Sequence, residues 1–179
     1  LPTMHPSAGA SYLGANAAPF VINADPNSPG FSVPDLVAPV SFKVSRLEAR
    51  QKLLKRVDRF QQSAEVEANV NAQTVNVFRQ KAVDLMSSFT AKQAFDIHKE
   101  PSKLRDQYGR STLGQSCLMA RRLVEAGVRC VTIDHSNWDT HYDNFNLLKE
   151  HLLPDFDAAI PTLFADLQDR GLLKQTLVI

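Results

Sequence analysis

The stretch VRCVTIDHSNWDTHYDN, residues 128–144, decides the predicted fold. Its first eight residues are mostly apolar and β-branched, which is typical of a strand inside a parallel sheet. Helical patterns precede it at 112–127 and follow it from residue 144, and the run TLVI at 176–179 predicts a second strand. Strand, helix, strand at this spacing is a βαβ unit. The sequence therefore predicts an α/β fold with a parallel sheet.

The chain before residue 112 predicts two other kinds of structure. Residues 1–44 hold most of the prolines, which predicts an ordered, loop-rich segment that wraps over a core. Residues 45–111 predict helices: one that opens with the capping box SRLE at 45–48, one from about 71 to 86, one from residue 90, and one at 100–110. We expect 1–44, 45–111 and 112–179 to be parts of one incomplete domain. The strand-like end at 176–179 predicts that the chain is an internal piece of a longer protein.

Composition excludes two classes of partner. The net charge of +1 carries no electrostatic signature of nucleic-acid binding, and no apolar run is long enough for a transmembrane segment. The two cysteines, Cys117 and Cys130, are too few for a disulfide scaffold. Both lie in apolar patterns, which favours buried free thiols over a bridge.

The helix predicted at 112–126 has one face directed at the sheet and one face in water. The residues predicted to be buried are Leu113, Cys117, Ala120 and Val124, and those predicted to be exposed are Arg121, Arg122 and Glu125. The helical stretch from 144 to 170 contains Pro154 and Pro161, so we expect pieces or a kink there, with Gly171 ending it.

The loop that follows the predicted strand is the candidate site. Ligands gather at the carboxyl ends of parallel strands, and Asp139 and His141 are two residues apart, which puts both side chains on one side of an extended chain. Carboxylate oxygen and imidazole nitrogen suit zinc or another divalent metal ion. A structural interpretation stays open, in which Asp139 or Asp143 caps the next helix and Trp138 is a packing anchor.

The sequence also resembles a known family. The blocks are ASYLGANAAPFVINADPNSPGFSVPDL, RLEARQKLLKRVDRF, YGRSTLGQSCLMARRLVEAGVRCVTIDHSNWDTHYDNF and LLPDFDAAIPTLFADLQDRGLLKQTLVI. In this order they resemble a large bacterial family of exported, sulfatase-like proteins in the alkaline-phosphatase superfamily. The resemblance implies an alkaline-phosphatase-like parallel-sheet sandwich and an exported or periplasmic location. By its WDTH block, Asp139 and His141 would be metal ligands, and the nucleophile would lie outside this chain.

Two functions follow as expectations. The first is a metal-dependent hydrolase of phosphate or sulfate esters, acting on a small molecule or a polysaccharide. In it Asp139 and His141 hold a divalent ion such as zinc, and His135 supports a ligand or contacts the substrate. The second is a non-catalytic exported binding or structural protein that keeps the fold. The sequence contains no phosphate-binding Gly-rich loop, G-x-S-x-G, H-E-x-x-H or C-x-x-C motif, so no complete catalytic set can be assembled from it.

Overall fold

A computed structural model describes residues 18–33, 36, 49–50, 52–53, 56 and 88–179. The chain divides into two compact units, one of Leu1–Thr3, Ile22–Val33 and Thr90–Ile179 and one of Met4–Val21 and Pro34–Phe89. Most described residues belong to the first unit. The helix predicted at 71–86 and most of the loop-rich segment at 1–44 lie outside the described residues. The predicted helix from residue 45 is described at five positions between 49 and 56, which are helical.

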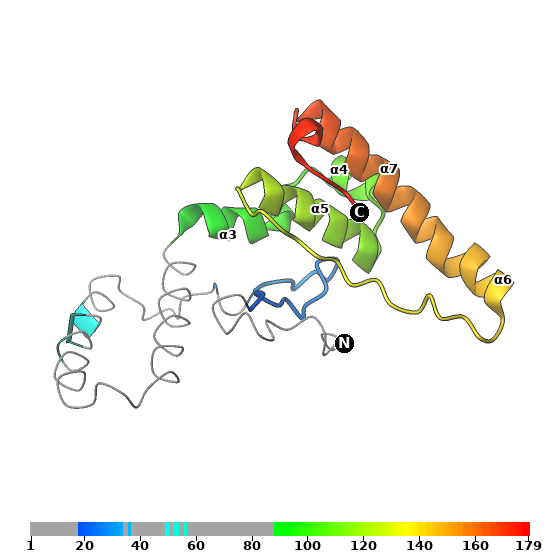
Figure 1. Cartoon of the computed structure of the whole chain (residues 1–179), viewed down its shortest axis with the longest axis horizontal. Coiled ribbons are helices and arrows are strands. Elements are labelled where there is room, and N and C mark those ends of the chain that lie inside the picture. Colours follow the sequence, from blue (N-terminus) through cyan, green and yellow to red (C-terminus); the bar gives the residue numbers. More distant parts are fainter. Residues whose placement is uncertain (1–17, 34–35, 37–48, 51, 54–55, 57–87) are drawn as a thin grey trace. The chain divides into compact units, whose positions relative to one another are not determined.

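Helices between residues 88 and 127 precede the segment 128–144 (Figure 1). They are α3 (Phe89–Phe95), α4 (Ser102–Gln107) and α5 (Thr112–Glu125), with a short 3₁₀ helix, η5, at Ile97–Lys99. Ser111 is the N-cap of α5, and its hydroxyl oxygen accepts a hydrogen bond from the Gly114 amide at 3.2 Å. Gly109 follows α4 with a φ of +85°, which glycine adopts without strain. The predicted helices at 90 and 100–110 are confirmed.

The chain after residue 143 forms three consecutive helical pieces. They are α6 (Asn144–Leu147), the π-helix η6 (Leu148–Leu152) and α7 (Leu153–Asp169), followed by the 3₁₀ helix η7 (Leu173–Gln175). Pro154 has no amide hydrogen to donate to the carbonyl of Glu150, and the π turn lies at this point. Pro161 lies inside α7, and Gly171 follows the helix with a φ of +71°. The predicted interruption near Pro154 and the stop at Gly171 are confirmed, whereas α7 continues through Pro161, so the break predicted there is wrong.

The predicted sheet is wrong. Within the described part of the chain, neither 128–135 nor 176–179 forms a strand, so an alkaline-phosphatase-like parallel-sheet sandwich is not supported. Residues 128–143 form a long irregular segment between α5 and α6, drawn in yellow in Figure 1. Val131, Ile133 and His135 are half-buried, whereas Thr132 and Asp134 between them are exposed. The period of two expected of a strand is present, but a strand also needs neighbouring backbone groups, which β-branched residues do not provide.

The core of the first unit lies between α5 and α7. Helix α4 contacts both of them. The least exposed hydrophobic residues here are Ile97, Tyr108, Cys117, Leu118, Ala159 and Leu167. Helix α5 therefore packs on a helix, and the prediction that it packs on a sheet is wrong. None of the helices that the structure describes is both long and apolar enough to cross a membrane.

The predicted burial of several α5 residues differs from the burial observed in the structure. Leu113 and Cys117 are buried as predicted, and Glu125 is exposed as predicted, while Ala120 and Val124 are half-buried. Arg121, predicted to be exposed, is 1% exposed, and the side chain of Arg122 is only 13% exposed. Both cysteines are free thiols, but only Cys117 is buried; Cys130 is exposed, so its predicted burial is wrong.

Candidate functional site

The segment from 128 to 143 carries the two predicted metal ligands. Asp139 Oδ1 and His141 Nδ1 lie 2.7 Å apart, and the two side chains are 86% and 74% exposed. The spacing of two residues does bring these groups together, as the sequence analysis expected. Both groups are open to solvent, and their role as metal ligands stays a prediction.

His135 contacts Trp138, and Trp138 in turn contacts α7. The His135 ring lies edge-on to Trp138 with centroids 5.6 Å apart, and Trp138 lies edge-on to Phe156 of α7 at 6.0 Å. The His135 Nε2 atom is buried and has no hydrogen-bond partner in the structure. Trp138 remains 41% exposed. These rings fasten the segment to α7, and the described contacts of His135 lead away from the Asp139–His141 pair.

Two residues with left-handed backbone flank the pair. Asn137 has a φ of +73° and Asp143 a φ of +51°, and Asn and Asp are the non-glycine residues that tolerate this conformation best. Asp143 occupies the N-cap position of α6, but its Oδ1 accepts from the Asn146 side-chain amide at 2.7 Å and makes no cap hydrogen bond. The chain therefore turns on both sides of Asp139 and His141, and Asp139 is not a helix cap.

The Asp139–His141 pair lies on open surface. A pocket of about 410 Å³ opens between α4 and α7, where its lining includes Leu104, Pro161 and Asp166, but no residue of 128–143 lines it. Among the residues that the structure describes, no group of three or more His, Cys, Asp or Glu side chains could hold a metal ion. A zinc ion at this pair would need further ligands.

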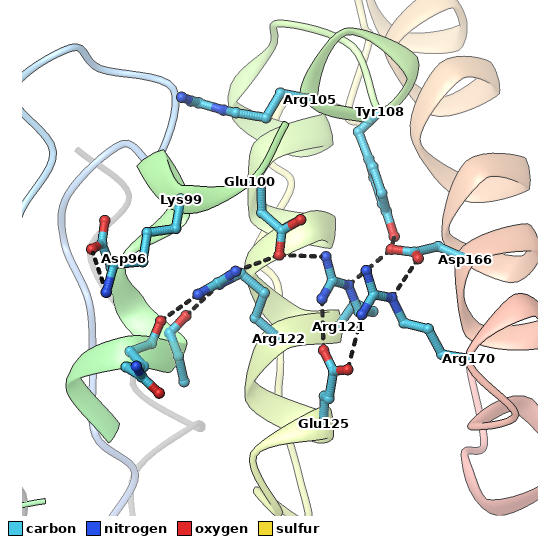
Figure 2. A network of polar contacts seen from close by, with 12 residues as sticks. Asp96, Lys99, Glu100, Arg105, Tyr108, Arg121, Arg122, Glu125, Asp166 and Arg170 are labelled. Carbon is cyan, nitrogen blue, oxygen red and sulfur yellow. Dashed lines mark hydrogen bonds and ion pairs between the residues drawn. The ribbon is translucent and has the colours of Figure 1, made fainter. Parts of the chain in front are cut away.

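A partly buried ionic cluster, which we call the Arg121 network, joins α5 to α7 (Figure 2). Its members are Glu100, Tyr108, Arg121, Arg122, Glu125, Asp166 and Arg170. Arg121 is at the centre, with its Nη2 2.8 Å from Glu100, its Nη1 2.7 Å from Glu125 and its Nε 2.8 Å from Asp166. Three arginines face three carboxylates, so the formal charge of the network is zero.

Arg170 and Tyr108 make the remaining contacts with the carboxylates of the network. Arg170 pairs with Asp166 at 2.7 Å and with Glu125 at 2.9 Å. The Tyr108 hydroxyl donates to Asp166 at 2.9 Å. Burial by itself raises the pKa of Asp166, but the contacts with Arg170, Arg121 and Tyr108 outweigh it and leave that pKa below its ordinary value. The pKa of Glu100 is likewise lowered, because Arg121 and Arg122 outweigh the effect of its burial.

The network lies near the start of the candidate segment. Residues 128–143 begin three residues after Glu125, whereas Asp166 lies in the last turn of α7, 23 residues after the segment ends. The sequence analysis missed the network, although a signal was present. Arg121 lies four residues after Cys117 and eight after Leu113, which places it on the predicted buried face.

A comparison with protein families gives one match, which covers residues 2–179. The chain belongs to the family described as "Protein of unknown function (DUF1501)". That description names no activity, and nothing in the comparison points to sulfatases or to the alkaline-phosphatase superfamily, so the predicted assignment to that superfamily is wrong. Neither the curated proteins nor the solved structures include a match to the chain.

Proposed function

We propose that the chain binds a divalent transition-metal ion, such as zinc, through Asp139 and His141. The observation that supports this is the 2.7 Å approach of a carboxylate oxygen and an imidazole nitrogen on an exposed segment. These are common zinc ligands, and both are open to an ion from solvent. The three acidic residues at 134, 139 and 143, with no lysine or arginine among residues 134–143, also favour a cation there.

The pair needs little rearrangement to accept an ion. Zinc bonds to nitrogen and oxygen are about 2.0–2.1 Å long, so two ligand atoms of a tetrahedral site lie about 3.3 Å apart. The two atoms are now 2.7 Å apart, so they must separate by about 0.6 Å and lose any shared proton. Both side chains are largely exposed, and a small rotation of either one is enough.

We propose that the bound ion serves binding to a partner rather than catalysis. Hydrolytic sites gain much of their power by excluding water, whereas Asp139 and His141 are 86% and 74% exposed. This function corresponds to the non-catalytic binding protein expected from the sequence, and an exported or periplasmic location stays part of that proposal.

A metal-dependent hydrolase of phosphate or sulfate esters, on a small molecule or a polysaccharide, is the second candidate. The observation that favours it is the small number of ligands. An ion held by two protein groups keeps coordination positions for an ester oxygen and a water molecule. His135 would then act at the edge of the site.

Zinc titration followed by calorimetry tests the metal site. We expect Asp139→Ala and His141→Ala each to lower zinc affinity at least tenfold, because neither ligand has a replacement among the described residues. His151→Ala is the matched control, since His151 is also an exposed histidine of the same unit. Quenching of Trp138, the chain's one tryptophan and the residue before Asp139, by Co²⁺ gives a second readout. Equal affinity in all variants would reject the metal site.

A second assay separates the two functions. The zinc-loaded chain is incubated with p-nitrophenyl phosphate and p-nitrophenyl sulfate, with and without chelator. Turnover that depends on both zinc and His141 would favour the hydrolase and contradict the binding role. Bound zinc without turnover would agree with the binding role.

A further inference from the structure

We propose that an exposed, acidic face of α7 binds a basic amphipathic helix of a partner protein, with or without a metal ion. The apolar residues of α7 form two rows. The buried row contains Ala159, Leu163 and Leu167, and it belongs to the core between α5 and α7. A helix with one buried face normally presents polar residues on its other side. The second apolar row is therefore a candidate docking surface.

The second row, which we call the outer row, consists of Leu153, Ile160 and Phe164. An α-helix turns about 100° per residue, so these three residues lie within about 40° of one another around the helix axis. Leu153 is 41% exposed, Phe164 is 40% exposed and Ile160 is half-buried. The row is about 18 Å long, which a partner helix of about 12 residues can cover.

Two aromatic rings extend the outer row on one side. Phe156 lies three residues after Leu153 and is 40% exposed, and it makes an edge-on contact with Trp138, which is 41% exposed. With side chains of roughly 200 Å² each, about 80 Å² of each ring is open to solvent. Together with Leu153 and Phe164 this gives about 300 Å² of apolar surface, a size that is often functional on a monomer. It is less than the roughly 800 Å² per partner of a stable interface, so we expect a transient complex that also depends on charge.

The charge around the outer row selects a basic partner. Residues 134–169 contain eight acidic residues and one basic residue, Lys149. Seven of the eight acidic residues are exposed or half-buried. The exposed Asp157 lies four residues after Leu153 and three before Ile160, so it borders the outer row directly. This surface attracts a cationic partner and repels nucleic acid and anionic membranes.

The shape of the outer row favours a helix as the partner element. The row is narrow and follows the axis of α7, and two helices pack side by side through such rows of side chains. An amphipathic helix would place its own apolar stripe on Leu153 and Phe164. Lysine or arginine residues at the edge of that stripe would then reach Asp157.

Fluorescence anisotropy of a labelled peptide tests the inference. The probe is a helical peptide of about 14 leucine and lysine residues, with its leucines at i, i+3, i+4 and i+7. We expect the chain to bind this peptide in the presence of EDTA, with an affinity that falls as the salt concentration rises. The same peptide with glutamate in place of lysine should not bind.

Substitutions locate the binding surface. Leu153→Ser and Phe164→Ser should each weaken binding of the leucine–lysine peptide about tenfold. Leu177→Ser is the control for these substitutions, because Leu177 is 82% exposed and lies outside residues 134–169. Asp157→Lys should weaken binding more than Asp169→Lys, since Asp169 is also exposed but lines the pocket between α4 and α7. Circular dichroism shows that each variant is folded.

The outcomes also separate this inference from the proposed metal site. Equal binding of the two peptides, or equal affinity in Leu153→Ser, Phe164→Ser and Leu177→Ser, would overturn the inference. Peptide binding that requires zinc and disappears in His141→Ala would overturn it as well, and would support the metal site. Peptide binding by a chain that binds no zinc would support the inference and reject the metal site.

Discussion

Replacing Arg121 by methionine removes the central cation of the Arg121 network and keeps an unbranched side chain of similar length. Arg121 is 1% exposed, and the side chains of its partners Glu100 and Asp166 are 8% and 9% exposed. Without the guanidinium, the network changes from neutral to a net charge of −1 in a place where water cannot solvate it. The substitution should therefore destabilise the chain strongly.

The expected loss of stability depends on the arginine that each carboxylate retains. Removing one partner of a buried ion pair costs about 3–5 kcal/mol. Here Asp166 retains Arg170, and Glu100 retains Arg122. We therefore expect the lower end of that range, about 3 kcal/mol, which is a large part of the 5–15 kcal/mol of a typical domain.

Urea denaturation followed by far-ultraviolet circular dichroism measures this loss. Lys99→Met is the matched control, because Lys99 pairs with Asp96 at 3.5 Å and the two side chains are 58% and 38% exposed. Exposed pairs contribute about 0–1 kcal/mol. A loss of less than about 1 kcal/mol in Arg121→Met, or equal losses in the two variants, would refute the structural role of the network.

The same network predicts how the stability of the folded chain depends on pH. The pKa values of Glu100 and Asp166 lie below their ordinary values of 4.5 and 3.8 in the folded chain. As the pH falls below about 4.5, the unfolded chain binds these protons first, so this part of the stability is complete above that pH and is lost on further acidification. Arg121→Met should show a shallower acid dependence in the same denaturation assay. Parallel curves for parent and variant would contradict this.

Two further predictions concern single side chains. Burial raises the pKa of Cys117 to about 11, whereas Cys130 is exposed. An aromatic disulfide reagent should therefore modify one thiol in the folded chain and two thiols in urea. The Cys130→Ser variant should have no reactive thiol until it unfolds. Gly114→Ala should destabilise the chain by about 1–3 kcal/mol although alanine favours helices, because its Cβ would overlap the Tyr108 carbonyl oxygen. Gly30→Ala, whose Cβ has no atom within 4 Å, is the control for this substitution and should be nearly neutral.

The helix boundaries could be predicted because their causes are local. The Ser111 hydroxyl caps α5 by accepting a hydrogen bond from the amide three residues later. Gly109 and Gly171, which each follow a helix, have a positive φ. Asp139 and His141 meet for a similar reason, since they are two residues apart and the Thr140 amide donates to the Trp138 carbonyl at 3.0 Å in a tight turn centred on Asp139. No distant part of the chain is needed for any of these features.

The predicted strand failed because a strand is not local. Residues 131–135 show the alternating burial of a strand, yet the hydrogen bonds that define one must come from backbone elsewhere. Apolar, β-branched residues favour extended chain but cannot specify a neighbour. The surroundings of His135 could not be predicted for the same reason. Its ring contacts Trp138, and Trp138 contacts Phe156, which is distant in the sequence.

The sequence by itself determined approximately where the main described helices lie, the interruption near Pro154, and which two side chains converge at residues 139 and 141. Tertiary structure alone decided that α5 packs on α7 instead of a sheet and that Arg121 is buried. The physical reason is pairing: a charged side chain is buried only where opposite charges meet it. Glu100 and Asp166, 21 residues before and 45 residues after Arg121, become its partners only when the helices assemble.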